Sequence, residues 1–202
     1  MMRIGAWLGL LCFLAAPAWA GAQKEEALSA SVQTAMQRSI NDALEPSLKF
    51  ANPAEGQAWI SEMSRRLAKR IPDEYMRSKL LTAIHYEATR AGLDPQLVLG
   101  LIHVESGFNR YAISPVGARG LMQVMPFWVR QIGTREHNLL DMYTNLRYGC
   151  TIMRHYLDIE KGDYYRALGR YNGSLGRPEY PNMVHAAWKN LYSWSYQPVA
   201  AR

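Results

Sequence analysis

The sequence predicts an all-helical protein, and three features of its pattern support that fold class. Apolar residues recur at spacings of three and four along most of the chain, which is the period of a helix with one buried face. No stretch between turn signals alternates apolar and polar residues for long enough to predict a strand. Several helical segments begin with a capping residue and proline and are followed by glycine, which are typical start and stop signals.

The first two helices are predicted from an apolar stripe and from a capping sequence. The stripe of the first helix consists of Leu28, Val32, Met36, Ile40 and Leu44. This helix must end before Pro46, because proline cannot continue a helix. Asn52 and Pro53 have the form of an N-cap and a first helical residue, with Glu55 at the third position. The second helix that they open ends by Pro72.

The third and fourth helices follow directly. Residues 76–88 carry apolar side chains at four-residue spacing, and Gly92 marks the end of this helix. Asp94 is a plausible cap for a fourth helix that opens with Pro95 and is apolar on nearly every side. We therefore expect the fourth helix, which ends at Gly107, to be the buried centre of the domain.

The remaining segments predict a loop and several more helices. Residues 107–120 are rich in turn-forming residues and predict a loop, followed by a short helical stretch up to Pro126. The last long helix is expected over residues 141–160. Shorter helices are predicted to begin at Asp163 and near Pro178.

The first twenty residues predict a secretory signal that is cleaved after Ala20. They contain one charge, Arg3, then an apolar run that Pro17 closes before it is long enough to span a bilayer. Since no other segment is apolar enough to cross a membrane, we expect an exported, periplasmic protein without stable membrane insertion. Removal of the signal lowers the net charge from +6 to +5, because Arg3 is the only charge lost.

Charge and cysteine content restrict the function only in part. A modest basic excess is compatible with solubility or with attraction to an anionic polymer such as cell wall, nucleic acid or lipid headgroups, and charge alone does not choose among them. After signal cleavage only Cys150 remains, so the domain has no intramolecular disulfide and no cysteine-rich metal site. About 180 residues suffice for one packed core without such cross-links.

Glu105 departs from the apolar pattern of the fourth helix. The helix period places it on the same face as Val98 and Ile102. Partial burial and the negative end of the helix dipole both favour its protonated form at neutral pH. A protonated carboxylic acid is what a glycosidase uses to protonate the leaving sugar oxygen. From helix position alone, the alternative is a glutamate paired with Arg110 or Arg119 at the domain surface.

The segment that begins at Glu105 reads ESGFNRYAISPVGARGLMQVMP. It resembles the catalytic domain of the soluble lytic transglycosylases, relatives of goose-type lysozyme, whose signature is Glu-Ser, a loop with A-x-S-x-x-G-A, and then G-L-M-Q. Similar residues occur upstream at Gly92 and Pro95 and downstream at Asn145 and Gly149, so the resemblance covers about residues 75 to 175. A long, ordered series of this kind is far more specific than one Glu-Ser pair.

The resemblance implies a lysozyme-like fold and a set of site residues. The catalytic acid and base of the family falls on Glu105. The positions that contact sugar in the family fall on Ser114, Gln123, Met125, Tyr171 and Asn172. Hydroxyl and amide groups suit N-acetyl and hydroxyl substituents, and a tyrosine offers a flat face to a sugar ring. Each position also has a structural alternative, such as a turn cap for Ser114 or a core position for Met125.

The implied reaction uses one carboxylate and no metal or cofactor. Glu105 protonates the bond between N-acetylmuramic acid and N-acetylglucosamine, and the N-acetyl group stabilises the positive carbon. Glu105 then takes the proton of the muramic acid 6-hydroxyl, which closes a 1,6-anhydro ring without water. The implied partner is the peptidoglycan strand and not nucleic acid; protein partners are not indicated.

The resemblance also suggests a division of the chain. Residues 1–20 form the signal, 21–72 an N-terminal helical extension, 73–176 the transglycosylase domain and 177–202 an aromatic-rich tail packed on it. The chain departs from the family at one place. The family continues Tyr-Asn with Ala-Gly, whereas in this chain Asn172 is followed by Gly173 and Ser174. The neighbouring part of the site is therefore expected to differ from the family.

Other chemistries are excluded by spacing, and two alternatives remain open. His103 and Glu105 fit half of a zinc deaminase motif, but the required cysteine pair is missing, and the sequence has no H-E-x-x-H and no G-x-S-x-G. His103 is therefore expected to be an ordinary helix residue. The alternatives are a muramidase that uses water in place of the 6-hydroxyl, and a module that binds peptidoglycan without cutting it.

Overall fold

The computed structural model describes residues 23–42, 50 and 52–197, and this part of the chain is helical without any named strand. The all-α prediction is confirmed for these residues. The predicted signal peptide and the stripe residue Leu44 lie outside them, and the first helix ends at Asn41, before Pro46 as predicted. Among the described residues, no helix combines the length and the apolar character that are needed to cross a bilayer.

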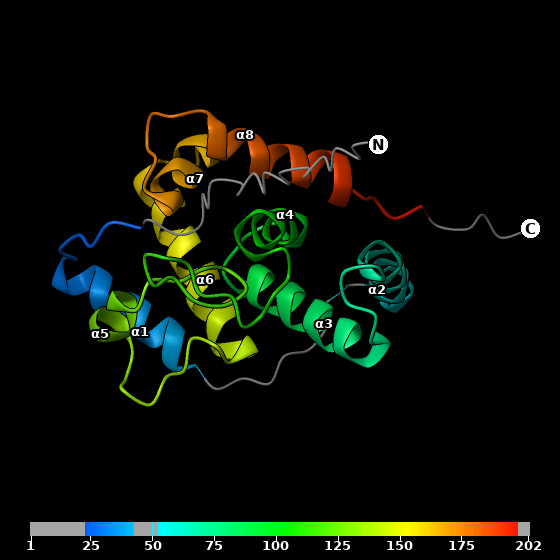
Figure 1. Ribbon diagram of the computed structural model, residues 1–202, viewed down its shortest axis with the longest axis horizontal. Helices are drawn as coiled ribbons and strands as arrows, with labels where there is room; N and C mark the ends of the chain where they lie inside the picture. Colours follow the sequence, from blue (N-terminus) through cyan, green and yellow to red (C-terminus); the bar gives the residue numbers. More distant parts are fainter. Residues whose placement is uncertain (1–22, 43–49, 51, 198–202) are drawn as a thin grey trace, which may run out of the picture.

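The helices surround one central member. In order they are α1 Ala30–Asn41, α2 Pro53–Leu67, α3 Glu74–Arg90, α4 Pro95–Ser106, α5 Phe127–Ile132, α6 Met142–Ile159, α7 Tyr164–Asn172, α8 Glu179–Ala186 and the π-helix Ala187–Tyr192. Figure 1 shows α4 nearly end-on in the middle, with α3 on one side and α8 on the other. The helix α6 passes beside them toward α1 and α5, and α2 packs on α3 at the opposite end.

Most helix boundaries follow the capping residues seen in the sequence. The Asn52 side chain accepts a hydrogen bond from the backbone of Ala54 at 3.0 Å, and Asp94 accepts one from Gln96 at 2.8 Å. At the other end of α4, Gly107 adopts the left-handed conformation with φ 57°. These local bonds satisfy backbone groups that the helix itself leaves unpaired, so the predicted starts of α2 and α4 and the end of α4 are confirmed.

The helix α4 is the buried centre that its apolar sequence predicts. Five of its residues have no exposed surface: Leu97, Val98, Leu99, Leu101 and Ile102. It packs against α3, against α8 and most extensively against the π-helix. The C-terminal tail is fastened to it by polar contacts as well, because Trp188 Nε1 donates a hydrogen bond to Asp94 Oδ2 at 3.0 Å.

Replacing Gly100 with alanine tests this close packing. In an isolated helix the change stabilises by about 0.5–1 kcal/mol. Here the added Cβ would lie 2.8 Å from the backbone nitrogen of Trp188, and backbone cannot move aside as a flexible side chain does. We expect a net destabilisation of about 1–3 kcal/mol, typical of overpacking, measured by urea denaturation. Ser78→Ala, on the exposed side of α3, is the control; a stabilised G100A protein would contradict the packing.

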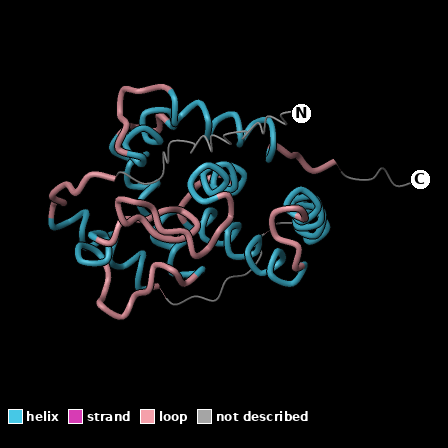
Figure 2. Tube along the Cα trace, viewed as in Figure 1, coloured by secondary structure: helices cyan, strands magenta, loops and turns pink. Residues whose placement is uncertain are grey.

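The prediction of a short helix ending at Pro126 is wrong. The segment before Pro126 forms a turn in which Arg119 and Val124 exchange two backbone hydrogen bonds of 3.0 Å, as in an antiparallel bridge. Gly120 and Gln123 have φ of 75° and 47°, which no right-handed helix contains. Pro126 instead precedes α5, where its missing N–H costs nothing. Figure 2 shows the resulting long loop beside α4.

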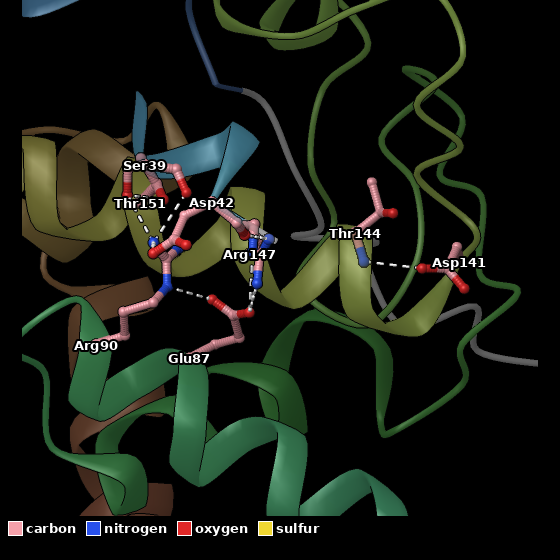
Figure 3. A network of polar contacts seen from close by, with 8 residues as sticks. All are labelled: Ser39, Asp42, Glu87, Arg90, Asp141, Thr144, Arg147 and Thr151. Atoms are coloured by element: carbon pink, nitrogen blue, oxygen red, sulfur yellow. Dashed lines mark hydrogen bonds and ion pairs between the residues drawn. The ribbon is translucent and has the colours of Figure 1, made fainter. Parts of the chain in front are cut away.

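A buried ion-pair network joins α1, α3 and α6 (Figure 3). Glu87 has no exposed surface and lies between two arginines. Its Oε2 accepts from Arg90 Nε at 3.0 Å, and its Oε1 accepts from Arg147 Nε and Nη2 at 3.0 and 2.9 Å. Arg90 also donates to the backbone oxygen of Ser39 at 2.8 Å, and Arg147 donates to that of Asp42. The two arginines thus connect a buried carboxylate to the end of α1.

Candidate active site

Glu105 lies in the last turn of α4 with its carboxylate directed into the protein. The residue is 5% exposed, so the surface position that helix pattern alone suggested is not the one observed. Its Oε1 accepts a hydrogen bond from the Tyr180 hydroxyl at 2.5 Å. A buried carboxyl group next to a phenol donor is suited to exchanging a proton with a bound ligand.

Tyr180 comes from α8 and is the site residue that sequence reasoning did not identify. Its ring is fully buried, as expected for a packed tail residue, but its hydroxyl meets Glu105 across 75 residues of sequence. Burial, the charge of Glu105 and the hydrogen bond to it raise the pKa of Tyr180 well above its usual range. The phenol therefore remains a donor at neutral pH. Helical periodicity contains no signal for such a contact, because it depends on how α8 packs on α4.

Replacing Tyr180 with phenylalanine tests this contact. The change removes one hydroxyl and keeps the buried ring, so the fold should persist. A hydrogen bond to a charged group contributes about 1.5–3 kcal/mol, and we expect a fall in activity of about tenfold or more. The measurement is the initial rate of the peptidoglycan cleavage that the motif series predicts. Tyr196→Phe, at a half-buried position of the tail, is the matched control, and an unchanged rate in Tyr180→Phe would show that this hydroxyl plays no part in catalysis.

The loop between α4 and α5, residues 107–126, carries most of the quoted motif and is called the motif loop here. Ser106 Oγ connects it to α4, donating to the backbone oxygen of Leu121 at 2.7 Å. Asn145 of α6 holds it from the other side. Its Oδ1 accepts from the Met122 nitrogen at 2.8 Å, and its Nδ2 donates to the oxygens of Arg119 and Leu139, both at 2.8 Å.

A glycine is needed where the motif loop meets Asn145. Gly120 has φ 75°, and a Cβ there would lie 2.4 Å from Asn145 Nδ2 and 2.6 Å from the Leu139 oxygen. Both the backbone conformation and the close approach exclude a side chain. The motif residues Ser106, Gly120 and Asn145 therefore fix the path of the chain next to Glu105.

Two of the predicted sugar-contacting residues brace the motif loop from within. Gln123 is 1% exposed, and its amide nitrogen donates to the backbone oxygens of Ala112 and Gly120 at 3.2 and 2.9 Å. Ser114 is half-buried, and its hydroxyl accepts from the Ala118 nitrogen at 3.0 Å, which is the turn-capping role considered as its alternative. The structure brings both residues into the loop that follows Glu105.

The other three predicted residues have different exposures. Met125 is half-buried at the end of the motif loop, and Asn172 is buried at the end of α7. Tyr171 has no exposed surface, so its ring does not offer the flat face to a sugar that was predicted. Its hydroxyl instead donates to the backbone oxygen of Met122 at 2.7 Å. Burial, followed by the charge of Glu105, raises the pKa of Tyr171 well above its usual range, which keeps this donor protonated.

His103 has ordinary structural contacts. Its Nδ1 lies 2.9 Å from the Tyr192 hydroxyl and its Nε2 lies 3.1 Å from Arg70 Nη2. Burial, together with the charge of Arg70, lowers its pKa. Within the described ranges, no three His, Cys, Asp or Glu side chains come together in a way that would ligate a metal ion.

The sequence profile of the family described as "Transglycosylase SLT domain" matches residues 82–182, half of the chain. The chain belongs to this family. The matched region contains Glu105, the motif loop and Tyr180. Membership confirms the family that the motif series predicts.

Individual SLT-family relatives match shorter segments. A transglycosylase of Enterobacteria phage PRD1 is 39% identical over 85 residues, which are 42% of this chain and 31% of that protein. Membrane-bound lytic murein transglycosylase C of Mannheimia succiniciproducens is 48% identical over 48 residues, 24% of this chain and 13% of that protein. The chain thus covers less than a third of the length of these relatives.

Among solved structures, an inactive mutant of the lytic transglycosylase Slt from Pseudomonas aeruginosa is similar to 82% of this chain and to 34% of that chain. The sequence identity is 19% and the TM-score is 0.44.

Proposed function

We propose that this protein is a peptidoglycan lytic transglycosylase in which Glu105 is the catalytic acid and base. The observation that carries the proposal is the buried Glu105 carboxyl group, which accepts a hydrogen bond from Tyr180 next to the motif loop of an SLT-family domain. The names of the relatives, a transglycosylase and a lytic murein transglycosylase, support the same reaction class.

In the proposed reaction, protonated Glu105 gives its proton to the oxygen that links N-acetylmuramic acid to N-acetylglucosamine. The bond from the anomeric carbon to that oxygen breaks, and the carbonyl oxygen of the N-acetyl group stabilises the anomeric carbon. Ionised Glu105 then removes the proton of the 6-hydroxyl, whose oxygen bonds to the anomeric carbon and closes the 1,6-anhydro ring. The proton balance returns Glu105 to its starting state.

A mechanism with one carboxylate is supported by the position of another buried acid. Glu87 is held between Arg90 and Arg147 in the network on α3 and α6, so it is committed to ion pairs there. Glu87 and Glu105 are the buried acids among the described residues, and with Glu87 committed elsewhere, assistance by the N-acetyl group accounts for the first step. Tyr180 stabilises the ionised form of Glu105 between the two proton transfers.

The predicted sugar-contacting residues divide into two proposed roles. Ser114 and Met125 are partly exposed on the motif loop, and we assign them to contacts with the sugar. Gln123, Tyr171 and Asn172 are buried, and we assign them to holding the shape of this side of the site. Residues 73–176 remain the proposed enzymatic unit, joined by Tyr180 from the tail, with export through a signal at residues 1–20.

The test is the chemical nature of the products. The purified protein is incubated with peptidoglycan, and the released fragments are analysed by mass spectrometry beside a sample without protein. Ends of 1,6-anhydro-muramic acid, lighter by one water than hydrolysis products, are expected. Reducing ends would make the protein a muramidase. A protein that sediments with the wall and releases nothing would be a binding module.

A further inference from the structure

The first described residue of the chain, Gln23, is built into the candidate site. It is a polar residue with only 4% of its surface exposed. Its Oε1 accepts hydrogen bonds from the Met125 nitrogen at 3.2 Å and from Trp128 Nε1 at 3.0 Å. Its Nε2 donates to the backbone oxygen of Gln123 at 3.3 Å. One amide group thus joins the end of the motif loop to the start of α5.

The backbone that Gln23 holds is strained. Gln123 has φ 47°, a left-handed conformation that costs an L-residue roughly 1–2 kcal/mol. Gln23 binds the peptide groups on both sides of the turn that follows, the oxygen of Gln123 and the nitrogen of Met125. Strained turns persist where surrounding contacts over-determine them. The amide of Gln23, 100 residues away in sequence, supplies contacts of this kind.

The residues after Gln23 hold this segment in place. Glu25 pairs with Arg130 of α5 at 3.3 Å, and the Glu26 backbone oxygen accepts from the Gln131 side chain at 3.0 Å. The Glu26 carboxylate lies 3.4 Å from Arg170 of α7. Residues 23–26 are therefore fastened to α5, which follows the motif loop, and to α7, which contains Tyr171.

We propose that Gln23 is a positioning residue for the reaction, acting through the motif loop. Its amide fixes the turn from Gln123 to Met125, and the same loop is tied to the Glu105 helix by Ser106. The segment lies well before the matched family region of residues 82–182, so this contact is an addition to the family domain. The inference rests on the proposed transglycosylase activity.

Two variants of Gln23 and one control test the proposal in the full chain. Gln23→Met keeps the length of the side chain and removes the hydrogen bonds to Gln123, Met125 and Trp128. Gln23→Glu keeps an acceptor for Met125 and Trp128 and loses the donor. Glu25→Gln breaks the neighbouring exposed ion pair with Arg130, which contributes only about 0–1 kcal/mol, and leaves the Gln23 amide and the Glu26 contacts in place.

We expect a graded loss of turnover. Misplacement of groups by about 1 Å costs up to about 100-fold in rate, so kcat should fall about tenfold or more in Gln23→Met. KM should change much less, Gln23→Glu should lie between Gln23→Met and the wild type, and Glu25→Gln should match the wild type. Rates are measured well below the melting temperature of every variant. Hydrogen exchange of the Met125 amide should be faster in Gln23→Met and unchanged in Glu25→Gln.

The outcomes separate this inference from the proposed function. If the wild type is active and Gln23→Met has the same kcat, the positioning role is overturned. This holds even where the Met125 amide hydrogen exchanges faster, because Gln23 would then be only structural. A Gln23→Met defect that Gln23→Glu does not relieve in part also overturns it. A wild type that releases no fragments contradicts the proposed function itself.

Discussion

Replacing Glu105 with glutamine is expected to abolish cleavage of peptidoglycan and to leave the fold intact. Glutamine has nearly the same shape, and its amide oxygen can accept the hydrogen bond from the Tyr180 hydroxyl as the carboxylate does. It cannot donate or take up a proton in the required step. General acid and base catalysis contributes about 10²- to 10⁴-fold, and in the proposed mechanism one residue performs both steps, so we expect a loss of at least about 10³-fold in kcat.

The measurement is the rate of release of muropeptides, together with sedimentation of the protein with the wall. Glu136→Gln, an exposed change of the same kind, is the matched control and should keep full activity. Retained wall binding without cleavage in Glu105→Gln would separate catalysis from docking. Retained cleavage would show that another group is the catalytic acid.

Replacing Glu87 with glutamine is expected to cause the largest loss of stability. The carboxylate has no exposed surface and neutralises both Arg90 and Arg147. Removing its charge leaves two largely buried guanidinium groups without that partner. Breaking a buried ion pair in this way costs about 3–5 kcal/mol, and the link from α3 and α6 to the end of α1 weakens with it.

Urea denaturation followed by circular dichroism measures this loss as a fall in the free energy of unfolding. Glu25→Gln is the matched control, because the ion pair of Glu25 with Arg130 joins two exposed side chains. Exposed pairs contribute about 0–1 kcal/mol, so the control should change little. Equal, small effects of the two substitutions would mean that the arginines find other partners when Glu87 loses its charge.

Helix positions were predictable where local signals act. Asn52, Asp94, Asp141 and Asp163 each cap a helix in the structure, and Gly107 ends α4 as expected. Capping bonds join residues two to four positions apart, so the sequence contains both partners within one turn. The apolar faces of the helices are predictable for the same reason, because the spacing of residues along one helix face depends only on the local sequence.

The segment before Pro126 shows where local signals failed. Its apolar residues have a spacing compatible with a helix, yet Arg119 pairs with Val124 and Gln123 adopts a left-handed conformation. Hydrogen bonds from Asn145 and Gln23, both distant in sequence, stabilise this path. Tertiary contacts overrode the local preference, and the helix begins only after the proline.

The sequence by itself determined the helical fold class, the buried character of α4 and the prediction of Glu105 as the candidate catalytic residue. Periodicity, caps and an ordered motif all lie in short stretches of chain, so they are readable before folding. Only the tertiary structure decided that Tyr180 meets Glu105, that Gln23 holds the motif loop and that Tyr171 is buried. These contacts join residues up to about a hundred positions apart, and no local pattern specifies them, because they exist only after the helices have packed.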